Sequence, residues 1–337
     1  MSVQSSGPSW PRPRTITWHR PLLWLSAAMA GVALVGVVGL LVDPRSLTGS
    51  QLWAKPLKFA ISILLYSLTL SWLLGLLRRG RRVAWWAGTI TAAFLTVEMI
   101  VIVGAAAAGV TSHFNVTTPF HAALWSVMAI SIVIVWASAL LVAVLLFRTD
   151  LGDPARSLAI RAGTLLAVTG MGLAFLMTGP TASQLDTFQG IAGAHTVGVP
   201  DGGPGLPLLG WSTVAGDLRI PHFVGMHALQ LIPLAALLLE VLARRIPALT
   251  DARTRFRLIW VVICLYLGVL TLLTGQALAG QSVVRPDALV AGIAAVLLLG
   301  SGVAAAGIAR AARRSRDALL QPAVAPRSAT NGHGTPA

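Results

Sequence analysis

Long runs of apolar residues, separated by short polar segments, fill most of this chain. A run of about 20 apolar residues can cross the roughly 30 Å hydrocarbon layer of a membrane as a helix, which pairs its own backbone polar groups. The pattern therefore predicts an all-α fold, a polytopic bundle of about eight transmembrane helices. The expected helices cover residues 22–42, 57–77, 83–110, 121–147, 162–179, 222–243, 258–279 and 288–309.

Composition points to the same class. The chain is 55% hydrophobic and only 11% charged, which is more apolar surface than one soluble core can bury. Its first apolar run is longer than that of a signal peptide, so we expect a retained helix. The single Cys264 excludes an internal disulfide. Residues 1–20 and 311–337 are expected to be disordered tails on either side of a transmembrane domain at 21–310.

The basic residues predict the orientation. Twenty of the 25 Lys and Arg residues lie in the tails and in the loops of one side, which the positive-inside rule assigns to the cytoplasm. Both termini are therefore expected to be cytoplasmic. The net charge of +14 is then a topology signal, so the expected partner is the lipid bilayer and not nucleic acid. The oligomeric state stays open. The outer side carries Arg45, Lys55, Lys58, Arg219 and Arg285.

One outer connection, residues 180–221, is much longer than the others. Its stretch 198–210 holds five Gly and three Pro, which favour tight turns, and the Gly spacing fits no phosphate-binding loop. A flexible linker is one interpretation. Apolar residues such as Phe188 and Trp211 favour the other, an ordered cap lying on the membrane surface.

Polar residues gather where this long connection runs into the sixth apolar run. Polar groups that enter lipid are costly and usually functional. Five of the seven His residues also fall on the outer side, so we expect one outer site for a small-molecule ligand at the ends of four helices. The expected site residues are Lys55, Lys58, His113, Asn115, His121, Asp217, Arg219, His222, His227 and Gln230.

The clustered imidazoles suggest a cofactor, either haem b or a transition metal, or a quinone. A haem takes axial ligands from two helices, for example His121 and His227. The metal candidates are His121, His222 and His227, although His222 and His227 lie roughly 140° apart around one helix. The alternative is that these rings simply hydrogen-bond to lipid, water or loop carbonyls at the membrane surface.

Glu98 is the other unusual residue. It lies about 15 residues after Val83 and therefore roughly 22 Å into its helix. A carboxyl group at that depth must be paired, protonated or in a wet cavity, so we expect it to face other helices. A proton-coupled small-solute transporter using Glu98 is thus a second functional hypothesis. Glu240 is expected to form a surface pair with Arg244.

A metal-dependent intramembrane hydrolase is the third hypothesis. It needs a His-bound metal that activates water, and the sequence has neither a His pair at i, i+4 nor an evident nucleophile. Whether the protein is an enzyme, a transporter or a binding protein stays open at the level of sequence.

Three segments carry a resemblance: W-A-K-P-L-K-F-A-I-S at 53–62, S-H-F-N-V-T-T-P-F at 112–120 and G-D-L-R-I-P-H-F-V-G-M-H-A-L-Q at 216–230. They resemble a group of uncharacterised bacterial multi-pass integral membrane proteins. The likeness covers most of the bundle but not the tails, and it implies no reaction. It implies a bacterial cytoplasmic (inner) membrane, with the outer face toward the periplasm or the exterior.

Overall fold

The computed structural model describes residues 16–320, and its helices follow the apolar runs. Within this range eight helices are long and apolar enough to cross a membrane, as the sequence predicts. Of the expected tails at 1–20 and 311–337, residues 1–15 and 321–337 lie outside the described residues. The expected tail at 1–20 is wrong at its inner end, because the buried His19 caps α1. The eight helices are α1 (Arg20–Val42), α2 (Ala54–Leu76), α3 (Arg81–Ala108), α4 (Pro119–Phe147), α5 (Pro154–Gly172), α7 (Arg219–Leu242), α8 (Ala252–Leu278) and α9 (Ala288–Leu320).

Capping residues set several helix boundaries. Thr118 and Asp153 accept backbone hydrogen bonds at the starts of α4 and α5, where Pro occupies the first turn. The cap at Asp153 explains why α5 begins eight residues before the expected start at 162. The predicted tail at 311–337 is wrong over its first ten residues, because α9 continues to Leu320. Ala and Arg are strong helix formers and extend it beyond the apolar run.

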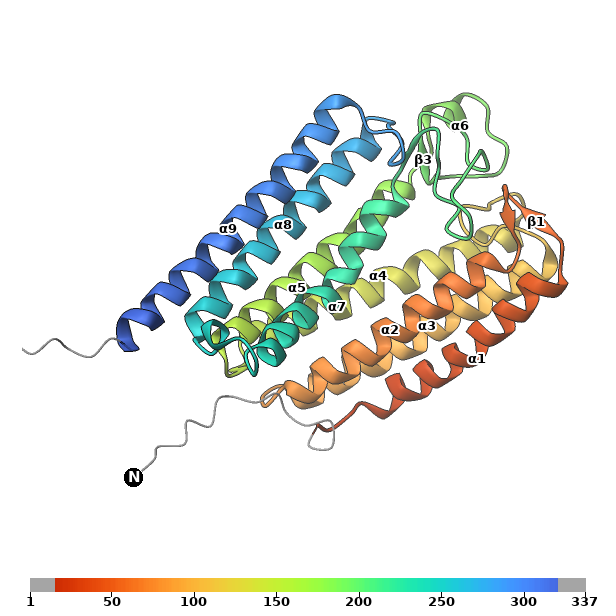
Figure 1. The fold of residues 1–337 in the computed structure, drawn as a ribbon. Helices are drawn as coiled ribbons and strands as arrows, with labels where there is room; N and C mark the ends of the chain where they lie inside the picture. The colour runs from red at the N-terminus through yellow and green to blue at the C-terminus, as the bar shows by residue number, and fades with distance from the viewer. Residues whose placement is uncertain (1–15, 321–337) are drawn as a thin grey trace, which may run out of the picture.

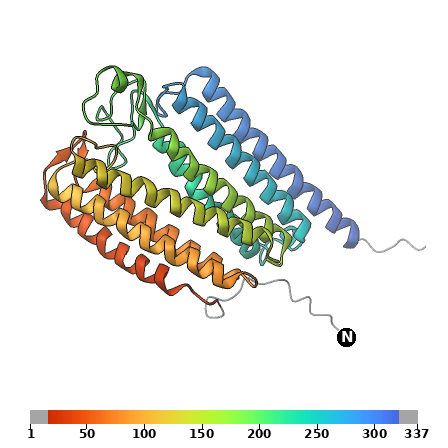
Figure 2. The ribbon, with the colours of Figure 1, turned by 180° about the vertical axis from the view of Figure 1, so that it is seen from behind.

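The helices form two groups (Figures 1 and 2). Helices α1–α4 share one core, which reaches the other group through Ile160 and Leu229. A second core, centred on Ile232 and Ile259, joins α5, α7 and α8, and α9 packs along α8. The two groups diverge toward the end of the bundle that carries α6 (Ala182–Asp186), which we call the loop end. The opposite end, where α1 begins and α9 ends, is the arginine-rich end.

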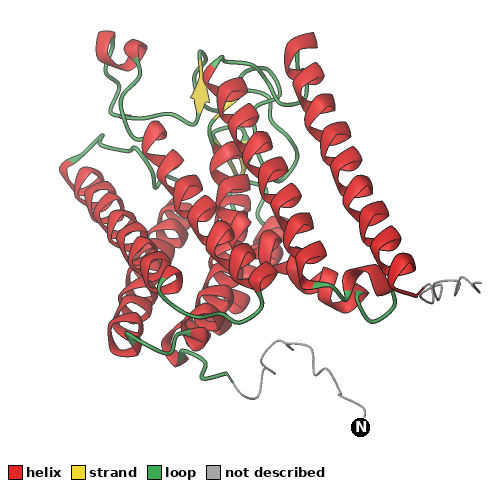
Figure 3. Ribbon diagram, turned by 90° about the vertical axis from the view of Figure 1, so that its left-hand side faces the viewer, coloured by secondary structure: helices red, strands yellow, loops and turns green. Residues whose placement is uncertain are grey.

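Residues 178–218, here called the cap, are folded over the loop end. Strand β3 (Thr196–Val197) pairs antiparallel with β4 (Gly216–Asp217), and Figure 3 shows the strands beside the helix ends. The cap also pairs with the α3–α4 loop, since Val116 N donates to Gly190 O at 2.8 Å and Ala192 N to Phe114 O at 2.8 Å. These hydrogen bonds confirm the expected ordered cap.

A short hairpin supports the cap from below. Strands β1 (Ser46–Leu47) and β2 (Ser50–Gln51) pair between α1 and α2, with Gly49 at φ +74° in the turn. A Cβ on Gly49 would lie 2.5 Å from Gly202 O of the cap. The glycine therefore permits the close approach of hairpin and cap.

Buried ion pairs fasten the arginine-rich end of the second group. Asp153 accepts from Arg255 at 2.8 Å, and Glu240 accepts from Arg156 at 2.9 Å. The expected pair between Glu240 and Arg244 is therefore wrong. Helix α5 starts early enough to bring Arg156 onto α7, and burial makes that ion pair costly to break from one side.

Reporter fusions test the orientation that the arginine distribution predicts. Fusions at Arg82, Arg148 and Arg257 should report the cytoplasm, and a fusion at Thr118 should report the outer side. Activity on the wrong side at any of these four positions would contradict the orientation or the number of spans.

A glycine contact between α5 and α7 gives a second prediction. A Cβ on Gly170 would lie 2.3 Å from the carbonyl carbon of Gly225, so Gly170→Ala must push two backbones apart. We expect the free energy of unfolding to fall by about 1–3 kcal/mol or more, measured as thermal or denaturant unfolding in detergent. Gly104→Ala is the matched control, because nothing lies within 4 Å of its Cβ. Equal loss of stability in both variants would contradict the packing argument.

Candidate functional site

Lys55 and His113 form one contact at the loop end. Lys55, in the first turn of α2, is partly exposed, and its Nζ lies 3.2 Å from His113 Nδ1. The His113 ring is enclosed by Phe59 and Trp125, with ring centroids 5.7 and 5.6 Å away. Burial, reinforced by the charge of Lys55, holds the pKa of His113 well below its usual value. The imidazole is therefore neutral, and Nδ1 can accept a hydrogen bond from the ammonium group.

Lys58 and Arg219 bind the cap from two helices. Lys58 Nζ donates to Leu209 O at 2.6 Å, and Arg219 Nη2 donates to Gly210 O at 2.6 Å. Arg219 also forms a two-pronged ion pair with Asp217, which is 1% exposed. The Asp217 carboxylate accepts a further bond from Ser212 N at 2.8 Å. Both carboxylate oxygens of Asp217 are thus occupied by hydrogen bonds that hold Arg219 and the cap in place.

These residues make up a basic cluster at the loop end. Lys55 lies within electrostatic range of both Lys58 and Arg219, and Lys58 within range of Arg219 and Asp217. The members come from α2, the α3–α4 loop and the start of α7. The structure therefore brings Lys55, Lys58, His113, Asp217 and Arg219 together.

The other expected site residues have separate partners. His121 Nδ1 lies 3.0 Å from Thr118 Oγ1, and Asn115 Oδ1 accepts from Thr117, so both shape the start of α4. Among residues 16–320, neither side chain hydrogen-bonds to the basic cluster. The expected single pocket holding all the imidazoles does not include His121, because its ring turns back onto its own helix cap.

The two histidines of α7 bond to different groups, although His222 lies within electrostatic range of His227 and His195. His222 Nδ1 lies 2.8 Å from Gly170 O of α5. His227 Nδ1 lies 3.3 Å from Gln230 Oε1, and Gln230 Nε2 donates to Thr69 Oγ1 of α2 at 3.3 Å. Gln230 therefore links the two helix groups. The described residues hold no group of three or more His, Cys, Asp or Glu side chains placed to bind a metal ion. The haem pairing of His121 with His227 stays a prediction.

His195 and Asp201 form a pair within the cap that the sequence did not single out. Asp201 accepts from His195 Nδ1 at 2.5 Å and from Thr196 Oγ1 at 2.8 Å, besides both backbone amides. Burial would raise the pKa of Asp201, but His195 and the Thr196 bonds hold it below its usual value. The residues lie in a segment without apolar periodicity, so no sequence pattern marks the pair.

Glu98 lies inside the bundle, which confirms that it faces other helices. The residue is 5% exposed, and among the described residues its Oε1 has no hydrogen-bond partner. Lys55 is within electrostatic range. Other buried polar atoms of α2, α3 and α7 also lack partners in the described structure, namely Tyr66 Oη, Ser67 Oγ, Thr91 Oγ1 and His227 Nε2.

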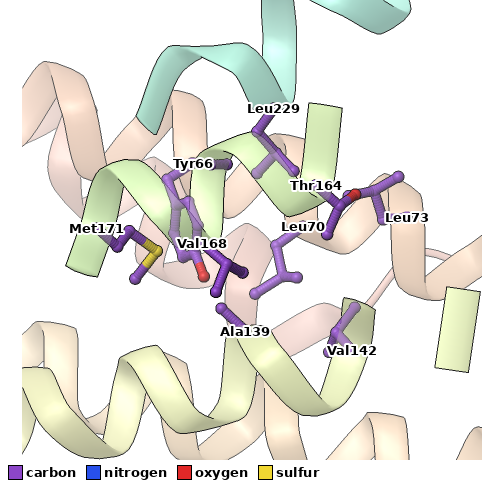
Figure 4. Close-up of a pocket in the computed structure, with 10 residues that line it drawn as sticks. Tyr66, Leu70, Leu73, Ala139, Val142, Thr164, Val168, Met171 and Leu229 are labelled. Atoms are coloured by element: carbon purple, nitrogen blue, oxygen red, sulfur yellow. The ribbon is translucent and has the colours of Figure 1, made fainter. Parts of the chain in front are cut away.

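A small cavity lies between the two helix groups (Figure 4). Its volume is about 10 Å³, close to that of a single water molecule. Tyr66 and Leu70 of α2, Ala139 of α4, Thr164 of α5 and Leu229 of α7 line it. The interface between the groups is therefore closed to any solute at this level.

Replacing Asp201 tests the hydrogen bonds within the cap. Asp201→Asn removes one carboxylate oxygen from four donors, and each buried donor left unpaired costs about 1–3 kcal/mol. We expect faster hydrogen exchange and faster proteolysis at residues 194–202. Asp186→Asn, at an exposed position of α6, should change neither. Unchanged exchange in Asp201→Asn would show that these bonds do not hold the cap.

Comparison of the chain with protein-family models, with curated proteins and with solved structures gave no match. The role of the site must therefore be inferred from its own residues.

Proposed function

We propose that this integral membrane protein is a proton-coupled transporter of a small solute, in which Glu98 binds the proton. The observation that carries the proposal is a buried carboxyl group whose Oε1 has no hydrogen-bond partner among the described residues. Buried carboxyl groups with a purely structural role are almost always hydrogen-bonded. A carboxyl group without a fixed hydrogen-bond partner is not locked in its protonated or its ionised form, so it can both gain and lose a proton.

The position of Glu98 supports a link to the loop end. It lies ten residues before the end of α3, about 15 Å along the helix axis. Lys55 of the neighbouring helix α2 is partly exposed at the loop end and interacts electrostatically with Glu98. Loss of the proton from Glu98 would therefore change the electrostatic potential at the basic cluster.

The two helix groups supply a means of alternating access. They diverge toward the loop end and close around a water-sized cavity deeper in the bundle. Polar side chains bridge them, including Gln230 with Thr69 and Trp136 Nε1 with Val168 O at 3.0 Å. Rocking of one helix group against the other is the usual way in which such transporters expose a site to each side.

The other hypotheses depend on the imidazoles acting together. Haem, metal or quinone binding draws on His113, His121, His222 and His227, and metal-dependent hydrolysis needs a His-bound metal. The hydrogen bonds of these four rings go to four different groups, namely Lys55, the start of α4, Gly170 of α5 and Gln230 of α7, which favours transport.

Cysteine labelling tests the proposal without knowledge of the solute. In a Cys264→Ala background, Ala167→Cys places a thiol at the cavity between the helix groups. Its reaction with a water-soluble maleimide in membrane vesicles should change severalfold between mildly acidic and mildly alkaline buffer, because protonation shifts the balance of two conformations. Adding Glu98→Gln should fix the rate near its acidic value.

Asp186→Asn in the same background is the matched control, since it also neutralises one carboxylate but lies exposed in the cap. It should leave the pH dependence intact. A labelling rate that is independent of pH, or a pH dependence that survives Glu98→Gln, would contradict the proposed function.

A further inference from the structure

Three hydrogen-bond donors from distant segments converge on Gly210 in the cap. A Cβ placed on Gly210 would lie 2.7 Å from Ser50 Oγ of β2, 3.9 Å from Lys58 Nζ and 3.9 Å from Arg219 Nη1. Gly210 has φ +66°, a conformation that favours glycine. The missing side chain leaves the three polar groups facing one another across a bare stretch of backbone.

These three groups have hydrogen-bonding capacity that the described residues leave unused. Within residues 16–320, Ser50 Oγ and Arg219 Nη1 have no hydrogen-bond partner, while Lys58 Nζ donates only to Leu209 O. The remaining nitrogens of Arg219 are bound to Asp217 and Gly210, which fixes the direction of the guanidinium group. All three side chains belong to partly exposed residues, so a solute can reach them from the loop end.

The local charge favours an anion. Lys55, Lys58 and Arg219 repel one another, and the nearest carboxylate, Asp217, is already bound on both oxygens. Asp201 is paired with His195. Helices α2 and α7 both begin here, and the positive ends of their dipoles add to the potential. The cluster therefore carries more positive than negative charge.

We propose that Ser50, Lys58 and Arg219 form a binding site for an oxyanion, a carboxylate or phosphate group, over Gly210. The inference rests on the proposed function and names its solute as a small anion. Two or three charge-assisted donors from a rigid frame are a common way to hold such a group. Lys55 does not touch the site but sets its potential.

The site also explains how a proton and an anion are bound together. The helices packed against α3 are α1, α2 and α4, and only Lys55 among their side chains is within electrostatic range of Glu98. A protonated Glu98 leaves Lys55 without that counter-charge and strengthens anion binding. An ionised Glu98 weakens it. The other titratable or charged side chains on α1–α4 are Arg20, Lys58, Tyr66, Arg81, Arg82 and His121.

Equilibrium binding tests the site. The full-length protein in nanodiscs of zwitterionic lipid is titrated with inorganic phosphate and with acetate, and binding is followed by calorimetry. We expect saturable binding of at least one anion. Lys58→Gln and Ser50→Ala should each weaken it about tenfold, which corresponds to roughly 1.4 kcal/mol. Lys58→Arg should restore much of the affinity, because it restores the charge.

Arg285→Gln is the matched control, because it removes one positive charge from the loop end outside the cluster. Its affinity should equal that of the native protein. A second set of nanodiscs containing phosphatidylglycerol separates the two sources of the anion. A bound lipid headgroup would compete with phosphate and acetate in these nanodiscs only, and a free solute would bind equally in both.

The outcomes for site and transport can be told apart. The oxyanion site is overturned if the native protein, Lys58→Gln and Ser50→Ala bind the anion with equal affinity. It is also overturned if neither phosphate, acetate nor a lipid headgroup binds. Either result holds even if labelling at Ala167→Cys depends on pH. Anion binding that depends on Lys58 and Ser50 supports the site. If that binding weakens from mildly acidic to mildly alkaline buffer equally in the native protein and in Glu98→Gln, its link to the proton is overturned and the site stands.

Discussion

The cost of an unpaired charge away from water governs this structure. In hydrocarbon each charged or polar group must be neutralised, bonded or moved to an aqueous edge. Glu240 and Asp153 are bound to arginines on neighbouring helices. The lysines stay at the loop end. Glu98 is turned away from lipid but left without a bond to Oε1, and this difference from the other acidic groups is why we assign it a proton.

The remaining architecture places that carboxyl group between two movable parts. Glycines such as Gly170 let α5 and α7 pack tightly within one helix group. The two groups meet through the edge of the first core at Ile160 and Leu229, a water-sized cavity and a few polar bridges. Strong packing inside each group and weaker contact between them favour motion of one group against the other. The cap, fastened to both groups through Lys58 and Arg219, lies where such motion would open a path.

Local patterns in the sequence could predict the helices and the direction of one buried side chain. Apolar runs predicted all eight helices, and the cost of a buried carboxylate predicted that Glu98 faces inward. Contacts between distant segments could not be predicted, because no local pattern records them. The pairing of Arg156 with Glu240, the His195–Asp201 pair and the meeting of Ser50, Lys58 and Arg219 over Gly210 depend on how the cap and helices pack. His121 was grouped with the other imidazoles by sidedness alone, and its ring bonds to its own helix cap instead.

Infrared difference spectroscopy on the protein in lipid tests the protonation of Glu98 most directly. A carboxylic acid that gains its proton in the bundle should show a carbonyl stretching band that appears on acidification, and Glu98→Gln should remove that band while Asp186→Asn retains it. A spectrum in which no carbonyl band depends on both pH and Glu98 would contradict the account, because Glu98 would then hold a fixed protonation state and could not couple a proton to transport.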